Sequence, residues 1–578
     1  MNLLKGIAVS PGIAIGRVFF LPKEDFKISE EEIAPAEISR EIEKLHQALK
    51  LSKEELSEIK FQEKISDSFL EPQILFLDDS QVMAETVKKI KQERKNAAFI
   101  FTEVTKKVIN SLSKSENLYL KERITDIKDV VKRVISHLVG HKAPKSLREI
   151  DEESIVVAHE LSPSETAQLP REKVKGFATE IGGRTSHTAI MARSLEIPAV
   201  VGIPEISKLV KSGDLMVVDG NKGIVMVNPK EKELEDYRRR QKEYLEFLKE
   251  NQELKELPAV TLDEYEVEVA ANIELPEEVE SVISHGAKGI GLFRTEFLYL
   301  TYHSLPNEEE QYKIYKMVAE KIAPEDVIIR TFDLGGDKLG IGQNEYHEIN
   351  PFLGWRAIRF CLAQPEIFKT QLRAILKAST LGNVKIMLPM ISDLTEVKRA
   401  KEIIAEVRMD LQRRDIEFDS QCPVGIMIET PAAALCAADL AKEVDFFSIG
   451  SNDLTQYVLA VDRANERVAY LYEHLHPAVL RLIKEVIDIG HQHQIWVGLC
   501  GEMSAEPLVI PILLGFGIDE LSMSPLAVPE TKRIIRSFTL EEAREISEKV
   551  LSLTLAAEIK EYVGERIQEK AIKIIFEK

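Results

Sequence analysis

The chain has 578 residues, of which 44% are hydrophobic and 30% are charged, so it is long enough for three or four domains with buried cores. Its formal net charge of -20 argues against general binding to nucleic acid or to an anionic membrane, although it permits a locally basic site. Four cysteines without CxxC spacing indicate neither a disulfide framework nor a zinc site, and no stretch reads as a signal peptide or a membrane span. We therefore expect a cytoplasmic protein with no nucleic-acid partner and no membrane insertion.

The N-terminal part begins as strands and then changes to helices. Residues 7–21 are apolar and β-branched on both sides of a Ser-Pro-Gly turn, which predicts two short strands. Residues 29–138 are charged and periodic with almost no Gly or Pro, which predicts an antiparallel bundle of four helices. We assign this helical insert to residues 23–145.

Strand-like runs return after the insert. They include residues 154–161 and a predicted hairpin that turns at 219–222. Together with the first strands they predict a compact α/β domain made of residues 1–22 and 146–229.

The stretch GGRTSHTAIMARSLEIPAVVG, residues 182–202, carries a lone histidine within this α/β domain. Its glycines allow a tight turn, Ser186 can cap a helix, and His187 then lies at the helix N-terminus. Amides at that end attract anions, and the helix dipole disfavours imidazolium, so the ring would be neutral and nucleophilic beside a phosphate site. From this stretch alone, an ordinary helix start with a capping histidine remains an open alternative.

The remaining sequence predicts a linker and a barrel. Residues 230–257 are charged on most faces, which suits a solvated linker helix at a swivelling joint. Beyond them, eight short apolar runs separated by helical patterns predict a TIM (β/α)8 barrel over residues 258–578. The runs are residues 267–273, 289–293, 327–332, 384–390, 425–429, 446–450, 496–502 and 520–524.

Arginines follow several of these runs, at the strand ends where barrel active sites form. Arg294, Arg330 and Arg463 offer planar, bidentate donors for phosphate and carboxylate groups. Arg356 is either a fourth such donor or the partner of a nearby acid. Lys338, in the string GGDK, either contacts phosphate or belongs to a plain turn.

Two acids and a cysteine also follow or end predicted barrel strands. Glu429 and Asp453 end neighbouring strands and could share one Mg²⁺ with substrate oxygens and water. Cys500 is either a small buried hydrophobe or a thiol that delivers a proton to a reactive carbon. The other cysteines are expected to be buried hydrophobes; they are Cys361, Cys422 and Cys436.

The histidine stretch resembles the phosphohistidine signature of enzymes that use phosphoenolpyruvate. The barrel resembles the phosphoenolpyruvate-binding domain of the same family through its strings RTEFL, RTFDLGGDK, NPFLGWRAIR, IMIETPAA, FFSIGSNDLTQY, AVDRAN and GLCGEM. The order of the pieces, without a large nucleotide-grasping domain at the front, is similar to the enzyme I branch of the sugar phosphotransferase system. That resemblance implies a multidomain α/β architecture, a helical insert that docks the carrier protein HPr, and a homodimer formed through the barrel.

The resemblance also implies residue roles. His187 would take the phosphoryl group on Nε2, Cys500 would protonate the enolate to give pyruvate, and Thr166 would orient the histidine unless it is only a helix cap. Glu429 and Asp453 would ligate Mg²⁺. The predicted substrate-binding set is Arg294, Arg330, Asn452, Asp453, Arg463, Arg356, Lys338 and Thr166.

Two other classes of function account for less of the sequence. A different barrel enzyme acting on a small 2-oxo acid with Mg²⁺ would leave the histidine stretch and the helical insert without a role. A non-catalytic regulator would be expected to lack His187, Cys500 or a metal ligand, and the sequence retains all of them.

Overall fold

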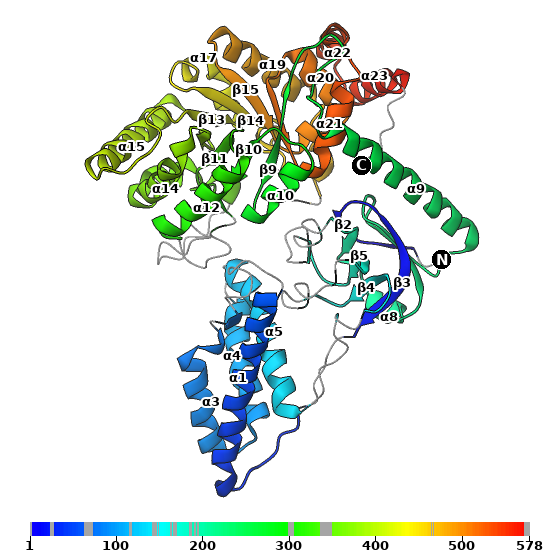
Figure 1. Cartoon of the computed structure of the whole chain (residues 1–578), viewed down its shortest axis with the longest axis vertical. Helices are drawn as coiled ribbons and strands as arrows, with labels where there is room; N and C mark the ends of the chain where they lie inside the picture. Colours follow the sequence, from blue (N-terminus) through cyan, green and yellow to red (C-terminus); the bar gives the residue numbers. More distant parts are fainter. Residues whose placement is uncertain are drawn as a thin grey trace. The chain divides into compact units, whose positions relative to one another are not determined.

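The structure is a computed structural model that divides into two compact units, one made mainly of Met1–Phe247 and the other of Leu248–Ile575 (Figure 1). The described residues are 3–22, 28–62, 73–74, 76–114, 118–140, 147, 150–161, 165, 170, 172–183, 188–189, 192, 196–296, 298, 306–335, 350–463, 465 and 467–570.

Four long helices are present among the described residues of the N-terminal insert. Helix α3 shows how the sequence builds them: Asp79 caps its N-terminus by accepting from two backbone amides, and Val82, Thr86 and Ile90 form one buried stripe at helical spacing. The helix ends at Arg94, which adopts a left-handed conformation. The helices are α1 (Ile38–Gln62), α3 (Ser80–Glu93), α4 (Ala97–Lys114) and α5 (Leu118–Val139), and they share one apolar core.

An eight-stranded mixed sheet forms the α/β part of the first unit, with strand order β1-β8-β7-β3-β4-β5-β6-β2. The predicted hairpin is present, because β7 and β8 pair antiparallel on either side of the Asp219 turn. A short helix, α8 (Ile206–Leu209), follows β6. The strands are β1 (Leu3–Lys5), β2 (Ile7–Ser10), β3 (Ile13–Leu21), β4 (Ser154–Ala158), β5 (Val174–Thr179), β6 (Ala199–Val201), β7 (Leu215–Asp219) and β8 (Ile224–Val227).

The predicted linker helix is α9 (Glu231–Leu254). Its first half packs on the sheet, where Leu234 and Tyr237 join a small apolar cluster. Arg240 forms an ion pair at 2.7 Å with Asp219, whose side chain is fully buried at the hairpin turn. This end of α9 is therefore fixed to the sheet.

The second unit contains a closed barrel of parallel strands, β9 to β16. Its strands are buried on both faces, because one face lines the barrel interior and the other lies under a layer of helices. The strands are β9 (Glu268–Ile273), β10 (Ile290–Arg294), β11 (Val327–Arg330), β12 (Val384–Leu388), β13 (Val424–Ile428), β14 (Phe446–Gly450), β15 (Trp496–Cys500) and β16 (Glu520–Met523).

Helices surround the barrel, as Figure 1 shows. They are α10 (Val279–Ser284), α12 (Glu308–Ile322), α13 (Ile358–Ala363), α14 (Pro365–Ala378), α15 (Leu394–Arg413), α16 (Pro431–Leu435), α17 (Ala437–Leu440), α18 (Ser451–Leu459), α19 (Pro477–Gln492), α20 (Ile510–Phe516), α21 (Val528–Ile535), α22 (Leu540–Ser552) and α23 (Ala556–Glu569). Within the described ranges, no helix combines the length and apolar character needed to span a membrane.

The predicted fold class is confirmed: the chain is a multidomain α/β protein with a helical bundle and a closed eight-stranded barrel. Each of the eight apolar runs overlaps one barrel strand. The four domain boundaries remain predictions.

Candidate functional site

The polar residues expected at the strand ends lie together at one rim of the barrel. Arg294, Arg330 and Cys500 are the last residues of β10, β11 and β15, and Glu429 directly follows β13. Asn452 and Asp453 lie in the first turn of α18, directly after β14. Because all eight strands are parallel, their carboxyl ends meet at this rim. We call this group, with the acids and the arginine that contact it, the rim cluster: Arg294, Glu296, Arg330, Asp333, Arg356, Glu429, Asn452, Asp453, Arg463 and Cys500.

Two arginines of the rim cluster are bound by carboxylates. Arg330 pairs with Glu296 and lies 3.2 Å from Asp333. Arg356 donates two hydrogen bonds to Asp333, at 2.9 and 2.7 Å, and its Nη2 lies 3.5 Å from an oxygen of Asp453. Arg356 therefore forms the predicted ion pair with a nearby acid, while its role as a donor to the substrate remains a prediction.

The other two arginines also lie close to carboxylates. Arg294 donates to Glu274 at 2.6 Å. Arg463 is exposed and its Nη2 lies 3.5 Å from Oδ1 of Asp453. The cluster thus presents guanidinium groups from four separate segments to one region, which suits a ligand with several anionic oxygens.

Glu429 and Asp453 form a buried pair of acids. Glu429 is 2% exposed, and its Oε1 accepts a hydrogen bond of 2.6 Å from the amide of Met390, which adopts a left-handed φ of 56°. Burial raises the pKa of Glu429, and the charges of Asp453 and Asp333 raise it further. A cation bound beside Glu429 would favour the charged form of its carboxyl group.

These acids fit a divalent cation. Oδ1 of Asp453 is buried and accepts no hydrogen bond, so a hard oxygen ligand is available there. Gly450 permits the close approach of Glu429, because a Cβ at that position would lie 2.9 Å from Oε2. Over the part of the chain that the structure describes, no group of three or more His, Cys, Asp or Glu side chains could hold a metal. Glu429 and Asp453 as ligands of Mg²⁺ remain a prediction.

Cys500 is a buried thiol at the carboxyl end of β15, next to the apolar interior of the barrel. It is 2% exposed and contacts the apolar residues that fill the barrel interior. Burial raises its pKa to about 11, although the hydroxyl of Ser448 and the charges of Arg330 and Arg294 oppose that rise. The sulfur therefore carries its proton at neutral pH, as a proton donor must.

Three predicted site residues, His187, Thr166 and Lys338, lie outside the described residues. Asn452 lies in the rim cluster, where its Oδ1 accepts from the amide of Glu502 at 3.1 Å. The expectation that all other cysteines are buried was wrong for Cys436, which is exposed because it lies at the surface junction of α16 and α17.

Sequence reasoning missed two residues of the site. Glu274, the partner of Arg294, directly follows β9, and the strand-end rule that identified the arginines also applies to it. Ser448 contacts Cys500 from inside the barrel. The alternation of β14 could have indicated it, because Phe446, two residues earlier, faces the same interior.

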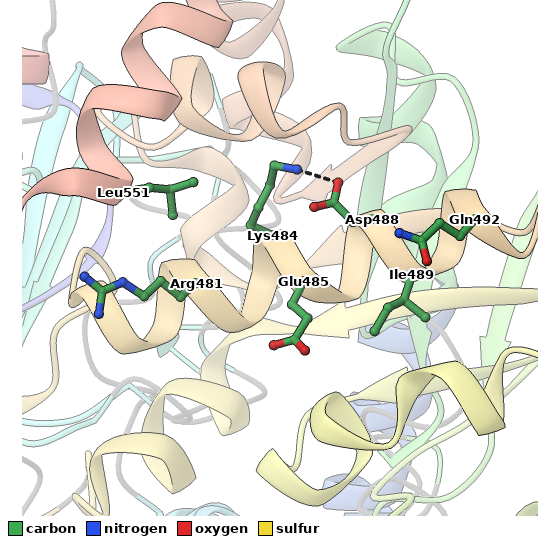
Figure 2. Close-up of a pocket in the computed structure, with 7 residues that line it drawn as sticks. All are labelled: Arg481, Lys484, Glu485, Asp488, Ile489, Gln492 and Leu551. Atoms are coloured by element: carbon green, nitrogen blue, oxygen red, sulfur yellow. Dashed lines mark hydrogen bonds and ion pairs between the residues drawn. The ribbon is translucent and has the colours of Figure 1, made fainter.

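Two hollows lie on the barrel unit. One, of about 680 Å³, adjoins the rim cluster through Met390 and is lined by Phe352, Leu353, Thr430 and Tyr457, among others. The second, of about 470 Å³, lies on the outer helices α19 and α22, where Figure 2 shows Lys484 turned toward Asp488. It contains none of the predicted site residues.

Comparisons with known proteins agree with the motifs. Residues 5–123, 150–223 and 248–540 match the models of the PEP-utilising enzyme N-terminal, mobile and PEP-binding domains, where PEP is phosphoenolpyruvate. A phosphoenolpyruvate-protein phosphotransferase from Staphylococcus aureus is 43% identical over 572 residues, covering 98% of this chain and 100% of the relative. One from Geobacillus stearothermophilus is 46% identical over 565 residues, covering 97% of each chain. The solution structure of an Enzyme I protein is 42% identical and covers 42% of this chain and 99% of that chain, with a TM-score of 0.37.

The resemblance that the motifs carried is therefore confirmed at the level of the family. These relatives match nearly the whole length of the chain and share one enzyme name. The chain belongs to the PEP-utilising enzymes and, within them, to the phosphoenolpyruvate-protein phosphotransferase family.

Proposed function

We propose that this chain transfers the phosphoryl group of phosphoenolpyruvate to its own His187 and then to a histidine of the carrier protein HPr, releasing pyruvate as the first step of sugar uptake. The observation that supports it most is the rim cluster, where arginines, two buried acids and a protonated thiol converge at the carboxyl end of a barrel. Each is a group that phosphoenolpyruvate chemistry requires.

The arginines would bind and orient the substrate. Phosphoenolpyruvate carries a phosphate and a carboxylate, and planar guanidinium groups bind both in bidentate fashion. Arg294, Arg330, Arg463 and Asn452 would contact the substrate, while Arg356, held by two hydrogen bonds to Asp333, would fix the neighbouring Asp453. Orientation and charge neutralisation supply most of the rate in phosphoryl transfer.

We propose Glu429 and Asp453 as the protein ligands of Mg²⁺. A bound Mg²⁺ would supply electrostatic stabilisation of the phosphate and carboxylate oxygens. Met390 would keep Glu429 in place, because its amide binds one oxygen and leaves the other for the metal.

His187 would attack the phosphorus while Cys500 donates its proton to the methylene carbon of the departing enolate, giving pyruvate. The histidine would then carry the phosphoryl group to HPr, which we expect to dock on the helical insert, residues 23–145. One histidine cannot face both sites at once, so the α/β domain, residues 1–22 and 146–229, would swivel about the linker, residues 230–257. Thr166 would orient His187 and Lys338 would contact phosphate.

A homodimer formed through the barrel is part of the proposal. Leu353 and Phe352, neighbours in sequence, are 63% and 38% exposed beside the hollow of about 680 Å³, and we take them as the apolar contact of this dimer. Sedimentation of the Leu353→Asp variant against the unmodified chain tests this contact: a dimer that persists at equal concentration would exclude this surface. The cytoplasmic location remains a prediction.

The experiment that tests the proposed function is incubation of the purified chain with phosphoenolpyruvate and Mg²⁺, followed by intact mass and peptide mapping. We expect one acid-labile phosphate on His187 together with pyruvate. His187→Ala should abolish labelling but keep phosphoenolpyruvate binding, and chelation of the metal or Glu429→Gln should remove labelling in a folded chain. Pyruvate without phosphoprotein, or no reaction, would refute the assignment.

A further inference from the structure

A single side-chain hydrogen bond reaches the sulfur of Cys500 among the contacts that the structure describes. Ser448, at the centre of β14, donates from Oγ to Sγ at 3.3 Å, and both side chains are buried. The two strands are neighbours, since Ser448 pairs with Gly498 and Gly450 pairs with Cys500. The serine therefore reaches the sulfur from the adjacent strand.

The rest of the sulfur's surroundings are mainly apolar. Leu292, Ile328, Met387 and Met427 pack in the same interior cluster. The charged groups that act on the thiol are Arg330 of β11, Arg294 of β10 and Glu429 after β13. A thiolate formed here would be poorly solvated, so a direct hydrogen-bond donor would matter more than it does in water.

The proton transfer assigned to Cys500 ends in that thiolate. The S–H bond breaks, the π electrons of the enolate form a C–H bond at the methylene carbon, and the sulfur keeps the electron pair of the S–H bond. The oxygen side of the enolate becomes the carbonyl of pyruvate, and water later returns a proton to sulfur. No electron carrier takes part, so the step balances as a proton transfer.

We propose that Ser448 is a positioning residue for Cys500: its hydroxyl, which reaches the sulfur from inside the barrel, fixes the position of the sulfur and stabilises the thiolate that proton donation leaves behind. This inference rests on the proposed function, because it assumes that Cys500 is the acid. The serine itself touches neither the substrate nor the metal ligands in this assignment. Its effect therefore passes entirely through the sulfur.

A first measurement follows the reactivity of the Cys500 thiol without any catalytic turnover. Full-length protein is treated with iodoacetamide at pH 8.5, and the alkylation of Cys500 is followed by peptide mass. Hydrogen bonds to charged groups are among the strongest in proteins, so we expect Ser448→Ala to slow alkylation about tenfold. Ser448→Thr keeps the hydroxyl and should recover most of the rate.

Ser451→Ala is the matched control. Ser451 is equally buried and its Oγ lies 3.4 Å from the backbone oxygen of Cys500, but it does not reach the sulfur. We expect alkylation in this variant to match the unmodified chain. Tryptophan fluorescence reports whether each variant retains the folded barrel.

A second measurement follows pyruvate production and His187 labelling separately. Ser448→Ala should lower the kcat for pyruvate about tenfold with little change in the KM for phosphoenolpyruvate, and it should have no further effect in a Cys500→Ala background. Unchanged alkylation in Ser448→Ala overturns the proposal whatever the turnover shows. Slower alkylation with unchanged pyruvate production also overturns it, and identifies Cys500 as the failed assumption. A chain that never labels His187 refutes the proposed function, while the alkylation result still tests the contact.

Discussion

Glu520→Gln is expected to stabilise the barrel at alkaline pH. Glu520 begins β16, is 4% exposed, and its Oε1 accepts no hydrogen bond. Burial and, after it, the charge of Glu268 raise its pKa to about 8, against the opposing charge of Lys385. Glutamine has nearly the same shape and cannot ionise.

The sign follows from proton linkage. The pKa of Glu520 is higher in the folded chain than the ordinary value of 4.5, so the unfolded chain releases this proton first as pH rises. Folding is therefore opposed increasingly between about pH 4.5 and 8. A rise from 4.5 to about 8 corresponds to about 5 kcal/mol in full, of which a part is already present at pH 5 and a part develops only above pH 8, so we expect Glu520→Gln to gain roughly 3 to 4 kcal/mol more at pH 8 than at pH 5.

Urea unfolding followed by tryptophan fluorescence measures this difference. The chain has two tryptophans, Trp355 and Trp496, and both belong to the barrel unit, so the signal excludes the other unit. Glu308→Gln is a control of opposite sign, because the ion pairs of Glu308 with Arg373 and Lys377 outweigh burial and lower its pKa. The stability that Glu308 contributes is therefore present at pH 8 and is lost as pH falls. We expect Glu308→Gln to lower the free energy of unfolding at pH 8. An equal effect of Glu520→Gln at pH 5 and pH 8 would refute the reasoning.

Further predictions concern the metal site and the linker. Gly450→Ala would place a Cβ 2.8 Å from that of Glu429, so we expect Mg²⁺ dependence to shift to at least tenfold higher concentration in a folded barrel; an unchanged Mg²⁺ titration would contradict the assigned ligand. Arg240→Ala would leave the buried Asp219 without its cationic partner and destabilise the α/β domain by about 3 kcal/mol. We expect Arg240→Ala to speed hydrogen exchange in β7 and β8 and to leave exchange in the barrel unchanged. If β7 and β8 exchange at the same rate in the variant and in the unmodified chain, the ion pair contributes little stability.

The barrel and its rim could be predicted because their signals are local. A parallel strand is a short apolar run, and the residue that ends it lies at a known edge of the barrel, so Arg294, Arg330 and Cys500 could be placed from the sequence alone. Family membership was carried by whole strings of residues and is confirmed.

The pairing inside the rim cluster could not be predicted. Whether Arg356 meets an acid depends on the path of the loop before α13, and only the structure shows its two hydrogen bonds to Asp333. Cys436 was wrongly expected to be buried because a lone cysteine is usually a small buried hydrophobe, whereas a break between two short helices exposes it. The roles of the rim residues, and of His187, remain predictions.

The carboxylates that hold the arginines act as built-in competitors for the substrate. Asp333 and Glu296 are attached to the same barrel as Arg330, so their effective concentration at its guanidinium is high and does not change with the medium. Chloride or a monocarboxylate would have to displace these carboxylates from Arg330 with a single charge. A ligand that carries both phosphate and carboxylate, and that brings a cation to the displaced acids, would replace several of these contacts at once. The rim cluster would thus bind common monovalent anions weakly and select for a multivalent anion.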